Sequence, residues 1–178
     1  MKVAICEYGA GNVRSVRIAF ARLGVRETGD VIAADLAVLP GVGSAAAAME
    51  GLRARGHDEA LRERFAAGRP ILGICLGLQL ALEETEEDGG TAGLGLVPGR
   101  AERLREGRVP RIGWAPVEER GAYYFAHSYA AVTEHATARS EGIVAEVRFG
   151  PFLGCQFHPE KSGALGAQYL ERECLSLA

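Results

Sequence analysis

One cysteine of this chain stands in a setting that favours nucleophilic chemistry. Cys75 is the centre of the run Gly73-Ile74-Cys75-Leu76-Gly77, which follows an apolar stretch and precedes a segment of helical periodicity. This G-x-C-x-G turn is a form of the nucleophile elbow, in which glycines allow a tight backbone and the nucleophile stands clear of the sheet. The helix N-terminus behind it favours the thiolate. On this motif alone, a buried structural cysteine is the alternative.

A second motif supplies the groups that a cysteine nucleophile needs. His158 and Glu160 follow another apolar run far along the chain. A nucleophile requires a base to take its proton, and the base requires a third group that orients it. The two side chains are two residues apart and face the same side of an extended segment, and Pro159 restricts the backbone between them. The sequence therefore predicts a triad of Cys75, His158 and Glu160.

A third motif offers donors for a developing negative charge. The segment Pro40-Gly41-Val42-Gly43 comes directly after an apolar run. Acyl transfer places charge on a carbonyl oxygen, which backbone N–H groups stabilise. We expect one donor from Val42 or Gly43 and the other from Leu76, the residue after the nucleophile. By itself, the segment is more typical of a plain turn between a strand and a helix.

The pattern of apolar residues predicts how these motifs are positioned. The first half alternates buried strands with helices, and Ser44 and Asp58 are the expected caps of two of these helices. Such βαβ alternation predicts an α/β fold with a mostly parallel central sheet and helices on both faces. The later β-like runs predict a mixed β flank, and a closing helix follows. The expected strands are 2–6, 36–39, 70–75, 108–117, 123–132, 143–149 and 152–157, and the expected helices include 76–84 and 163–175.

Composition limits the classes of protein that this chain can belong to. Its 178 residues suit a single domain, 1–178, and its net charge of −3 without a basic stripe argues against nucleic acid as a partner. The first apolar run is too short for a signal peptide or a membrane span, so a cytoplasmic protein is expected. The four cysteines include no C-x-x-C pair, so neither a metal site nor a disulfide framework is indicated.

Taken together, the motifs resemble those of class I glutamine amidotransferases, and more closely those of the glutaminase subunits of imidazole glycerol phosphate synthase in histidine biosynthesis. The chain departs from the family pattern at Glu7, where Asp is usual, and at Ala115, where Asn is usual. The matching residues run in family order: Tyr8-Gly9-Ala10-Gly11-Asn12 with Ser15, Leu39 to Gly43, Gly73 to Gln79, Gly113-Trp114, His127-Ser128-Tyr129 and His158-Pro159-Glu160-Lys161-Ser162.

The resemblance implies a reaction, a substrate and a partner. Cys75 would release ammonia from L-glutamine, without metal or organic cofactor, and the ammonia would pass to a (β/α)₈ barrel cyclase subunit in a heterodimer. The residues implied to hold glutamine are Gly41, Gln79, Glu87, Ser128 and Tyr129, with Glu87 suited to the ammonium group. Those implied to lie near the cyclase are Asn12, Trp114 and Lys161. His127 and His135 receive no catalytic role.

Three other interpretations stay open at this stage. The first is another amidotransferase glutaminase, such as that of pyridoxal phosphate synthase, which the start of the chain and Lys161-Ser162 disfavour. The second is a stand-alone cysteine hydrolase or peptidase, which acts without a partner. The third is a catalytically silent binding module, which the complete triad disfavours.

Overall fold

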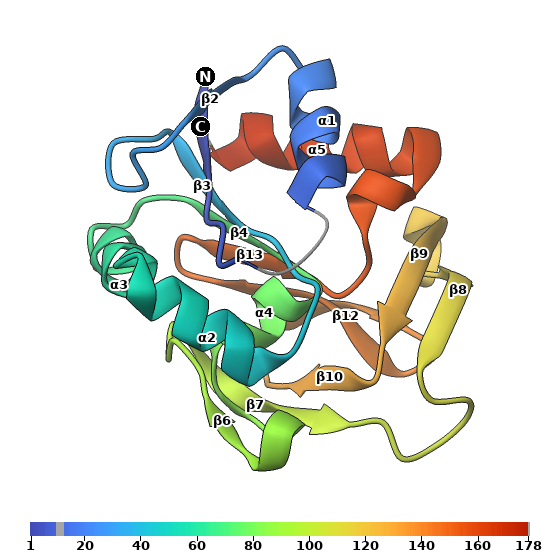
Figure 1. The fold of residues 1–178 in the computed structure, drawn as a ribbon. Helices are drawn as coiled ribbons and strands as arrows, with labels where there is room; N and C mark the ends of the chain where they lie inside the picture. Colours follow the sequence, from blue (N-terminus) through green and yellow to red (C-terminus); the bar gives the residue numbers. More distant parts are fainter. Residues whose placement is uncertain (10–12, 178) are drawn as a thin grey trace.

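A seven-stranded sheet forms the centre of the computed structural model, which describes residues 1–9 and 13–177 (Figure 1). Five neighbouring strands are parallel, and the two at one edge are antiparallel. The mostly parallel sheet expected from the sequence is thus confirmed. In spatial order the strands are β11 (Ala136–Ser140), β12 (Ile143–Phe149), β13 (Phe152–Cys155), β4 (Ile71–Ile74), β3 (Leu36–Leu39), β1 (Lys2–Ile5) and β2 (Arg26–Thr28).

Helices cover both faces of this sheet because its strands are apolar on both sides. In β3, Leu36 and Val38 belong to one buried cluster, whereas Ala37 and Leu39 belong to the other, as the alternation of side chains along a strand requires. One face carries α1 (Val13–Arg22) and α5 (Gly163–Leu177); the other carries α2 (Ala45–Ala54), α3 (His57–Ala66) and α4 (Leu76–Ala81) (Figure 1). Within the described part of the chain, no helix is long and apolar enough to cross a membrane.

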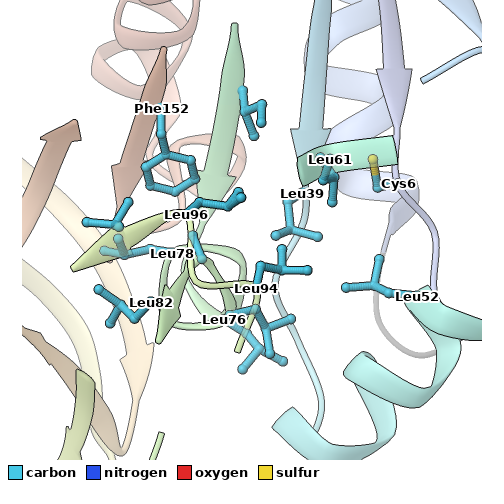
Figure 2. Close-up of a cluster of buried hydrophobic side chains, with 14 of the residues drawn as sticks. Cys6, Leu39, Leu52, Leu61, Leu76, Leu78, Leu82, Leu94, Leu96 and Phe152 are labelled. Carbon is cyan, nitrogen blue, oxygen red and sulfur yellow. The ribbon is translucent and has the colours of Figure 1, made fainter. Parts of the chain in front are cut away.

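The leucine-rich cluster on the α2 and α4 side fixes the start of α4 against the sheet. Figure 2 shows Leu76 and Leu78 of α4 in this cluster with Leu39 of β3 and Leu52 of α2. Leu39, Leu52 and Leu78 have no exposed surface. Each buried leucine of this kind contributes on the order of 2 kcal/mol from removal of apolar area from water. The turn that precedes α4 is therefore held by dense packing on its far side.

The β flank consists of a second sheet and a hairpin. The second sheet has the order β10 (Tyr129–Val132), β7 (Val97–Arg103), β5 (Leu82–Thr85) and β6 (Thr91–Ala92). The hairpin joins β8 (Arg111–Pro116) to β9 (Ala122–His127), with the 3₁₀ turn η2 (Glu118–Arg120) between them. Two further 3₁₀ turns are η1 (Glu87–Gly89) and η3 (Pro159–Lys161).

Three local expectations were wrong. The strand expected over 123–132 is two strands, β9 and β10, which are separated at Ser128 and belong to different sheets. The helix expected over 76–84 ends at Ala81, because Leu82 pairs with Val97 in the second sheet and continues as β5. Asp58 does not cap α3: the N-cap is Gly56, and Asp58 lies in the first turn, where it pairs with Arg62 at 3.2 Å. Ser44 does cap α2, since its side chain accepts a hydrogen bond from the N–H of Ala47.

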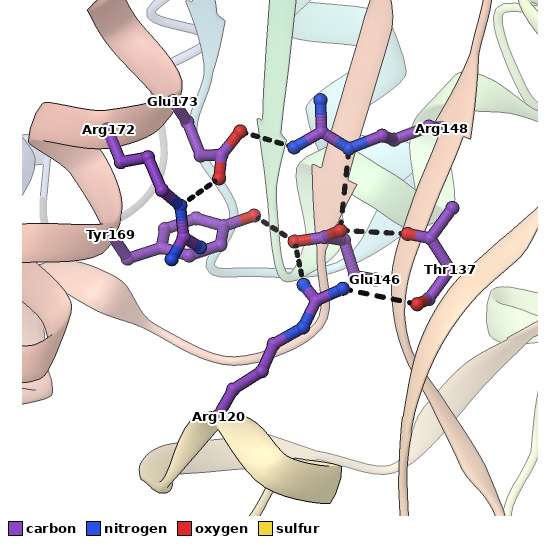
Figure 3. Close-up of polar contacts among 7 residues, drawn as sticks. All are labelled: Arg120, Thr137, Glu146, Arg148, Tyr169, Arg172 and Glu173. Atoms are coloured by element: carbon purple, nitrogen blue, oxygen red, sulfur yellow. Dashed lines mark hydrogen bonds and ion pairs between the residues drawn. The ribbon is translucent and has the colours of Figure 1, made fainter. Parts of the chain in front are cut away.

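A buried carboxylate ties α5 to the antiparallel edge of the main sheet. Glu146 of β12 has no exposed surface, and it accepts hydrogen bonds from Thr137 at 2.8 Å and from Tyr169 of α5 at 2.9 Å (Figure 3). Arg120 pairs with it at 2.8 Å. Burial by itself would raise the pKa of Glu146, but the hydrogen bonds from Arg120, Thr137 and Tyr169 lower it below its usual value.

Candidate active site

The elbow predicted around Cys75 is present between β4 and α4. Cys75 has φ 50° and ψ −107°, a left-handed conformation that non-glycine residues rarely adopt and that is typical of strained functional turns. The flanking glycines are required by close contacts. A Cβ on Gly77 would lie 1.9 Å from the carbonyl oxygen of Leu39, and one on Gly73 would lie 2.7 Å from the ring of Phe152. The turn therefore tolerates no larger side chain at either position.

His158 and Glu160 lie together beside this cysteine. His158 Nδ1 is 2.8 Å from Glu160 Oε1, and the two side chains are 2% and 3% exposed. Burial lowers the pKa of His158, but hydrogen bonds and charge interactions with Cys75 and Glu160 outweigh it and raise the pKa to about 9. With Nδ1–H donating to Glu160, the other ring nitrogen serves Cys75, which is the arrangement of a nucleophile, a base and an orienting acid.

Ser162 holds the backbone of this base in place. Its hydroxyl donates to the carbonyl oxygen of His158 at 2.7 Å and accepts from the N–H of Tyr124 at 3.0 Å. The N–H of His158 in turn donates to the carbonyl of Tyr124 at 2.8 Å. Strand β9 and the turn η3 are thereby locked together, which explains a structural need for serine after Lys161.

The loop expected to supply an oxyanion donor lines the same cavity as Cys75, but its Val42 amide is bound elsewhere. The N–H of Val42 donates to the hydroxyl of Tyr8 at 3.1 Å, so this amide is already engaged. Gly41 packs so closely on the start of α4 that a Cβ would lie 2.3 Å from the nitrogen of Leu76, and Gly43 has a left-handed φ of 114°. The assignment of Val42 as a donor therefore needs a rotated peptide.

The cavity beside Cys75 contains every residue implied to hold glutamine. It has a volume of about 340 Å³ and receives both Cys75 and His158. Tyr129 and Ser128 come from the β9–β10 junction, and Glu87 from η1. The predicted binding residues that line it are Gly41, Gln79, Glu87, Ser128 and Tyr129, together with Val42, Gly43 and Leu76 of the expected oxyanion site.

A larger hollow of about 680 Å³ lies next to this cavity, over β7, β10 and the loop before β8. It shares Ile112 with the smaller cavity but contains neither the nucleophile nor the base. The smaller cavity is the candidate site because Cys75 and His158 open into it.

Burial shifts the pKa of two ionisable side chains that line the cavity, Glu87 and His127. Burial raises the pKa of Glu87, and a hydrogen bond from the N–H of Ala45 at 3.0 Å partly offsets this. Burial lowers the pKa of His127 to about 4, and its Nδ1 lies 2.9 Å from the carbonyl oxygen of Tyr129. His127 is therefore neutral at physiological pH, unlike His158.

One contact of the cysteine comes from a residue that the sequence did not single out. Gln156 has no exposed surface, and its Nε2 lies 3.5 Å from Cys75 Sγ. The available signal was its position two residues before His158, which places both side chains on one face of an extended segment.

Two of the three residues expected at a subunit interface lie beside Tyr124. Trp114 is 59% exposed and packs edge-on against Tyr124, with ring centroids 6.2 Å apart. Lys161 lines the cavity, and its Nζ lies 5.9 Å from the centre of the same tyrosine ring. Asn12, the third such residue, lies outside the described residues.

The chain is similar in sequence and fold to known glutamine amidotransferases. Residues 12–177 match the family model described as "Glutamine amidotransferase class-I". The chain is 38% identical to "Imidazole glycerol phosphate synthase subunit HisH" of Corynebacterium diphtheriae, covering 95% of this chain and 96% of that protein. It is 39% identical to "Imidazole glycerol phosphate synthase hisHF, chloroplastic" of Arabidopsis thaliana. This match covers 96% of this chain but 33% of that longer protein. A crystal structure of a glutamine amidotransferase shares the fold, with a TM-score of 0.76 at 24% identity, and the match covers 98% of this chain and 97% of that one.

Proposed function

The chain belongs to the class I glutamine amidotransferase family, and on this premise we propose that Cys75, His158 and Glu160 hydrolyse the side-chain amide of L-glutamine. The protein is a glutaminase subunit of the imidazole glycerol phosphate synthase type, which acts in histidine biosynthesis. Residues 1–178 form one amidotransferase domain in this proposal. The observation that carries it is a buried Cys75 on a strained turn, facing a histidine that is held by a carboxylate.

The first half of the reaction releases ammonia. The thiolate of Cys75 attacks the carboxamide carbon of glutamine, and the carbonyl oxygen becomes an oxyanion. Protonated His158 gives its proton to the amide nitrogen, the carbon–nitrogen bond breaks, and ammonia leaves. A γ-glutamyl thioester on Cys75 remains. The raised pKa of His158 suits this role, because the histidine carries a proton to give at neutral pH.

The second half frees glutamate. Neutral His158 takes a proton from water, the resulting hydroxide attacks the thioester carbon, and the thiolate of Cys75 leaves. Glu160 keeps Nδ1–H of the imidazole directed at itself, 2.8 Å away, throughout both halves. The residue therefore orients the base and stabilises its charged form without contacting the substrate.

Two backbone amides are proposed to hold the oxyanion. The N–H of Leu76 is the first of α4, and the first amides of a helix have no acceptor within it. The second donor comes from the loop at Val42 and Gly43, once its peptide rotates from the resting orientation. Removal of one such donor typically costs on the order of 3 kcal/mol in transition-state stabilisation.

The cavity chemistry fits glutamine as the substrate. Its free ammonium group is proposed to bind Glu87, the one acidic side chain that lines the cavity among the described residues. Gln79, Ser128 and Tyr129 offer neutral polar groups for the rest of the amino-acid end. A half-buried carboxylate with a raised pKa is stabilised when a cation arrives, so binding of glutamine favours the charged form of Glu87.

The partner is proposed to be the cyclase subunit, docked at the mouth of the cavity. Ammonia released into neutral water becomes ammonium, which is no nucleophile, so a closed path to a second active site is chemically required. Lys161 lines the cavity, both Lys161 and Trp114 lie beside the ring of Tyr124, and Trp114 is 59% exposed. Asn12 is placed at the same contact by the family resemblance.

The test is to replace Cys75 by alanine in the complex with the cyclase. Glutamate release from glutamine should fall to background, while cyclisation supported by added ammonium salt continues. Cys155→Ala is the matched control, because Cys155 is equally buried in the neighbouring strand and should lose stability but keep glutaminase activity. Undiminished glutamate release by Cys75→Ala would exclude the assigned nucleophile.

The same assay separates a stand-alone hydrolase from an amidotransferase subunit. A stand-alone enzyme would release glutamate equally well with and without the cyclase. A subunit of a synthase would depend on its partner and would transfer ammonia to the substrate bound by the cyclase.

A further inference from the structure

We propose that Gln156 is a further catalytic residue of this site, a neutral donor that stabilises the sulfur of Cys75 as a thiolate. The proposal rests on the function proposed above, because it concerns the nucleophile of that reaction. It starts from the 3.5 Å contact between Gln156 Nε2 and Cys75 Sγ, which lies within the range of hydrogen bonds to sulfur.

The orientation of the Gln156 amide is fixed by a second buried glutamine. Gln79 Nε2 donates to the carbonyl oxygen of Tyr129 at 2.7 Å and to Gln156 Oε1 at 3.1 Å. These two bonds use both N–H groups of Gln79, because a carboxamide has two. Gln156 Oε1 is therefore an acceptor, and its NH₂ group is the end that faces Cys75. If the Gln156 amide were turned the other way, its NH₂ group would face the NH₂ group of Gln79, and the hydrogen bond between them would be lost.

Backbone hydrogen bonds hold the main chain of Gln156 in place, as they do that of His158. The N–H of Gln156 donates to the carbonyl oxygen of Ala145 in β12 at 2.9 Å, so the residue continues the sheet beyond β13. Phe157 points to the opposite side, into the buried cluster of α1 and α5. Gln156 and His158 thus approach Cys75 from one face of one segment, the first as a neutral donor and the second as a charged donor.

The surroundings explain why a neutral donor suits this position. Cys75 is 5% exposed, so water contributes little to the solvation of its thiolate, and donors from the protein must replace it. A second cation beside His158 would repel the imidazolium and would be costly to bury. An amide N–H stabilises the anion and leaves the proton of His158 available for transfer to the leaving group.

Two other titratable groups near the sulfur, Tyr8 and Cys155, do not provide charge that stabilises the thiolate. Burial raises the pKa of Tyr8 to about 12 and that of Cys155 well above its usual value, so both stay neutral around pH 7. His158, held by Glu160, is the charged donor. Of these three groups only His158 is charged, and Lys161, a second cation that lines the cavity, lies beside the ring of Tyr124.

The test is the pH dependence of Cys75 alkylation by iodoacetamide in the full chain, with Gln156→Met as the main variant. Methionine has a similar length but no N–H donor. The rate at Cys75 is read from the peptide that contains it by mass spectrometry, so the other thiols do not interfere. Loss of one hydrogen bond to a charged group should move the pH midpoint of alkylation up by about one unit, which is about a tenfold lower rate below the midpoint.

Controls separate this role from structural support. Tyr169→Phe removes a buried hydrogen bond to Glu146 without touching the contacts of Cys75, and it should lower the melting temperature but leave the midpoint in place. Gln156→Asn keeps an amide but shortens it by one methylene, and it should shift the midpoint in the same direction as Gln156→Met. An unchanged midpoint in both Gln156 variants would overturn the proposal, as would an equal shift in Tyr169→Phe.

The outcome is independent of whether the chain is a glutaminase. If Cys75→Ala kept glutaminase activity, the proposed function would fail, while the alkylation midpoint would still report on the donor. If the midpoint stayed fixed while Cys75→Ala was inactive, the proposal on Gln156 would fail alone. In the complex with the cyclase, Gln156→Met should lower kcat about tenfold and leave KM for glutamine within about twofold, because the donor contacts the sulfur and not the substrate.

Discussion

Protonation of His158 couples the stability of the fold to pH, and the structure gives the direction. Its pKa is about 9 in the folded chain against 6.5 for an unperturbed histidine: burial lowers it, and the interactions with Cys75 and Glu160 raise it by more. Between these two values the folded state binds a proton that the unfolded state has lost. The contribution of His158 is therefore complete below about pH 6.5 and disappears as the pH rises through about 9.

The magnitude follows from the size of this shift. At about 1.4 kcal/mol per pH unit, the gap between 6.5 and about 9 corresponds to about 3 kcal/mol of stability. The side chain is 2% exposed, so screening by solvent is slight. The value belongs to the coupled group of Cys75, His158 and Glu160, because the proton on the imidazole is held by both neighbours.

The assay is urea unfolding of wild type and of His158→Gln at a series of pH values from about 6 to about 10. Other titrating groups largely cancel in the difference between the two proteins. The free energy of unfolding of wild type should exceed that of His158→Gln by most at the acidic end, and this difference should fall by about 3 kcal/mol across the series. In Cys75→Ala, one of the two groups that stabilise the proton on His158 is gone, so the fall should be smaller and should end at lower pH. A difference that stays constant or grows with pH would refute the reasoning.

Three further predictions concern groups around this site and the fold that supports it. Glu160→Gln should keep the fold and KM but lower kcat about a hundredfold or more in the complex, measured as glutamate release, because an amide does not stabilise the imidazolium. Lys161→Ala should leave the circular dichroism spectrum unchanged but weaken the stimulation of glutaminase activity by the cyclase and its ligand, compared in one assay with wild type. Glu146→Ala should cost about 3 kcal/mol or more in urea unfolding, because Arg120 and Tyr169 lose the carboxylate that they share.

The parts of the fold that local sequence determines were predictable. The strands expected at 36–39 and 143–149 have those bounds in the structure, because each is rich in strand-forming residues and is bounded by turn residues: Pro40 follows the first, and Gly142 and Gly150 flank the second. The turn at Cys75 was also predictable, because its glycines are required by contacts within a few residues and by the neighbouring strand. His158 and Glu160 pair as predicted, but Glu160 lies in the 3₁₀ turn η3 and not on the extended segment from which the pairing was predicted.

Features that depend on distant partners were not predictable. The segment that begins at Leu82 continues the helical pattern, and only its pairing with Val97 makes it a strand. Gln156 gains its role from Gln79, whose position depends on α4 and β10. Side-chain periodicity carries no information on which distant residue completes a hydrogen bond.

The contact between Tyr8 and Val42 is the feature with the clearest consequence for control. Tyr8 is 3% exposed and follows β1, and its hydroxyl lies 3.1 Å from the nitrogen of Val42 and 3.0 Å from the carbonyl oxygen of Pro40. It therefore accepts from one end of the loop and donates to the other. While both bonds persist, the Val42 amide does not reach an oxyanion on Cys75. We therefore propose that this contact keeps glutamine hydrolysis low in the chain without the cyclase.

Tyr8→Phe should release this loop, because phenylalanine keeps the buried ring but has no hydroxyl. Loss of a hydrogen bond with a net value of about 0.5–1.5 kcal/mol should raise the glutaminase activity of the chain without the cyclase by about twofold to tenfold. Activity in the complex should change less, because the partner already favours the rotated loop. Tyr123→Phe is the matched control, since Tyr123 is equally buried at 3% but lies in β9 away from Val42. Unchanged or lower activity of Tyr8→Phe without the cyclase would show that the hydroxyl does not restrain the loop.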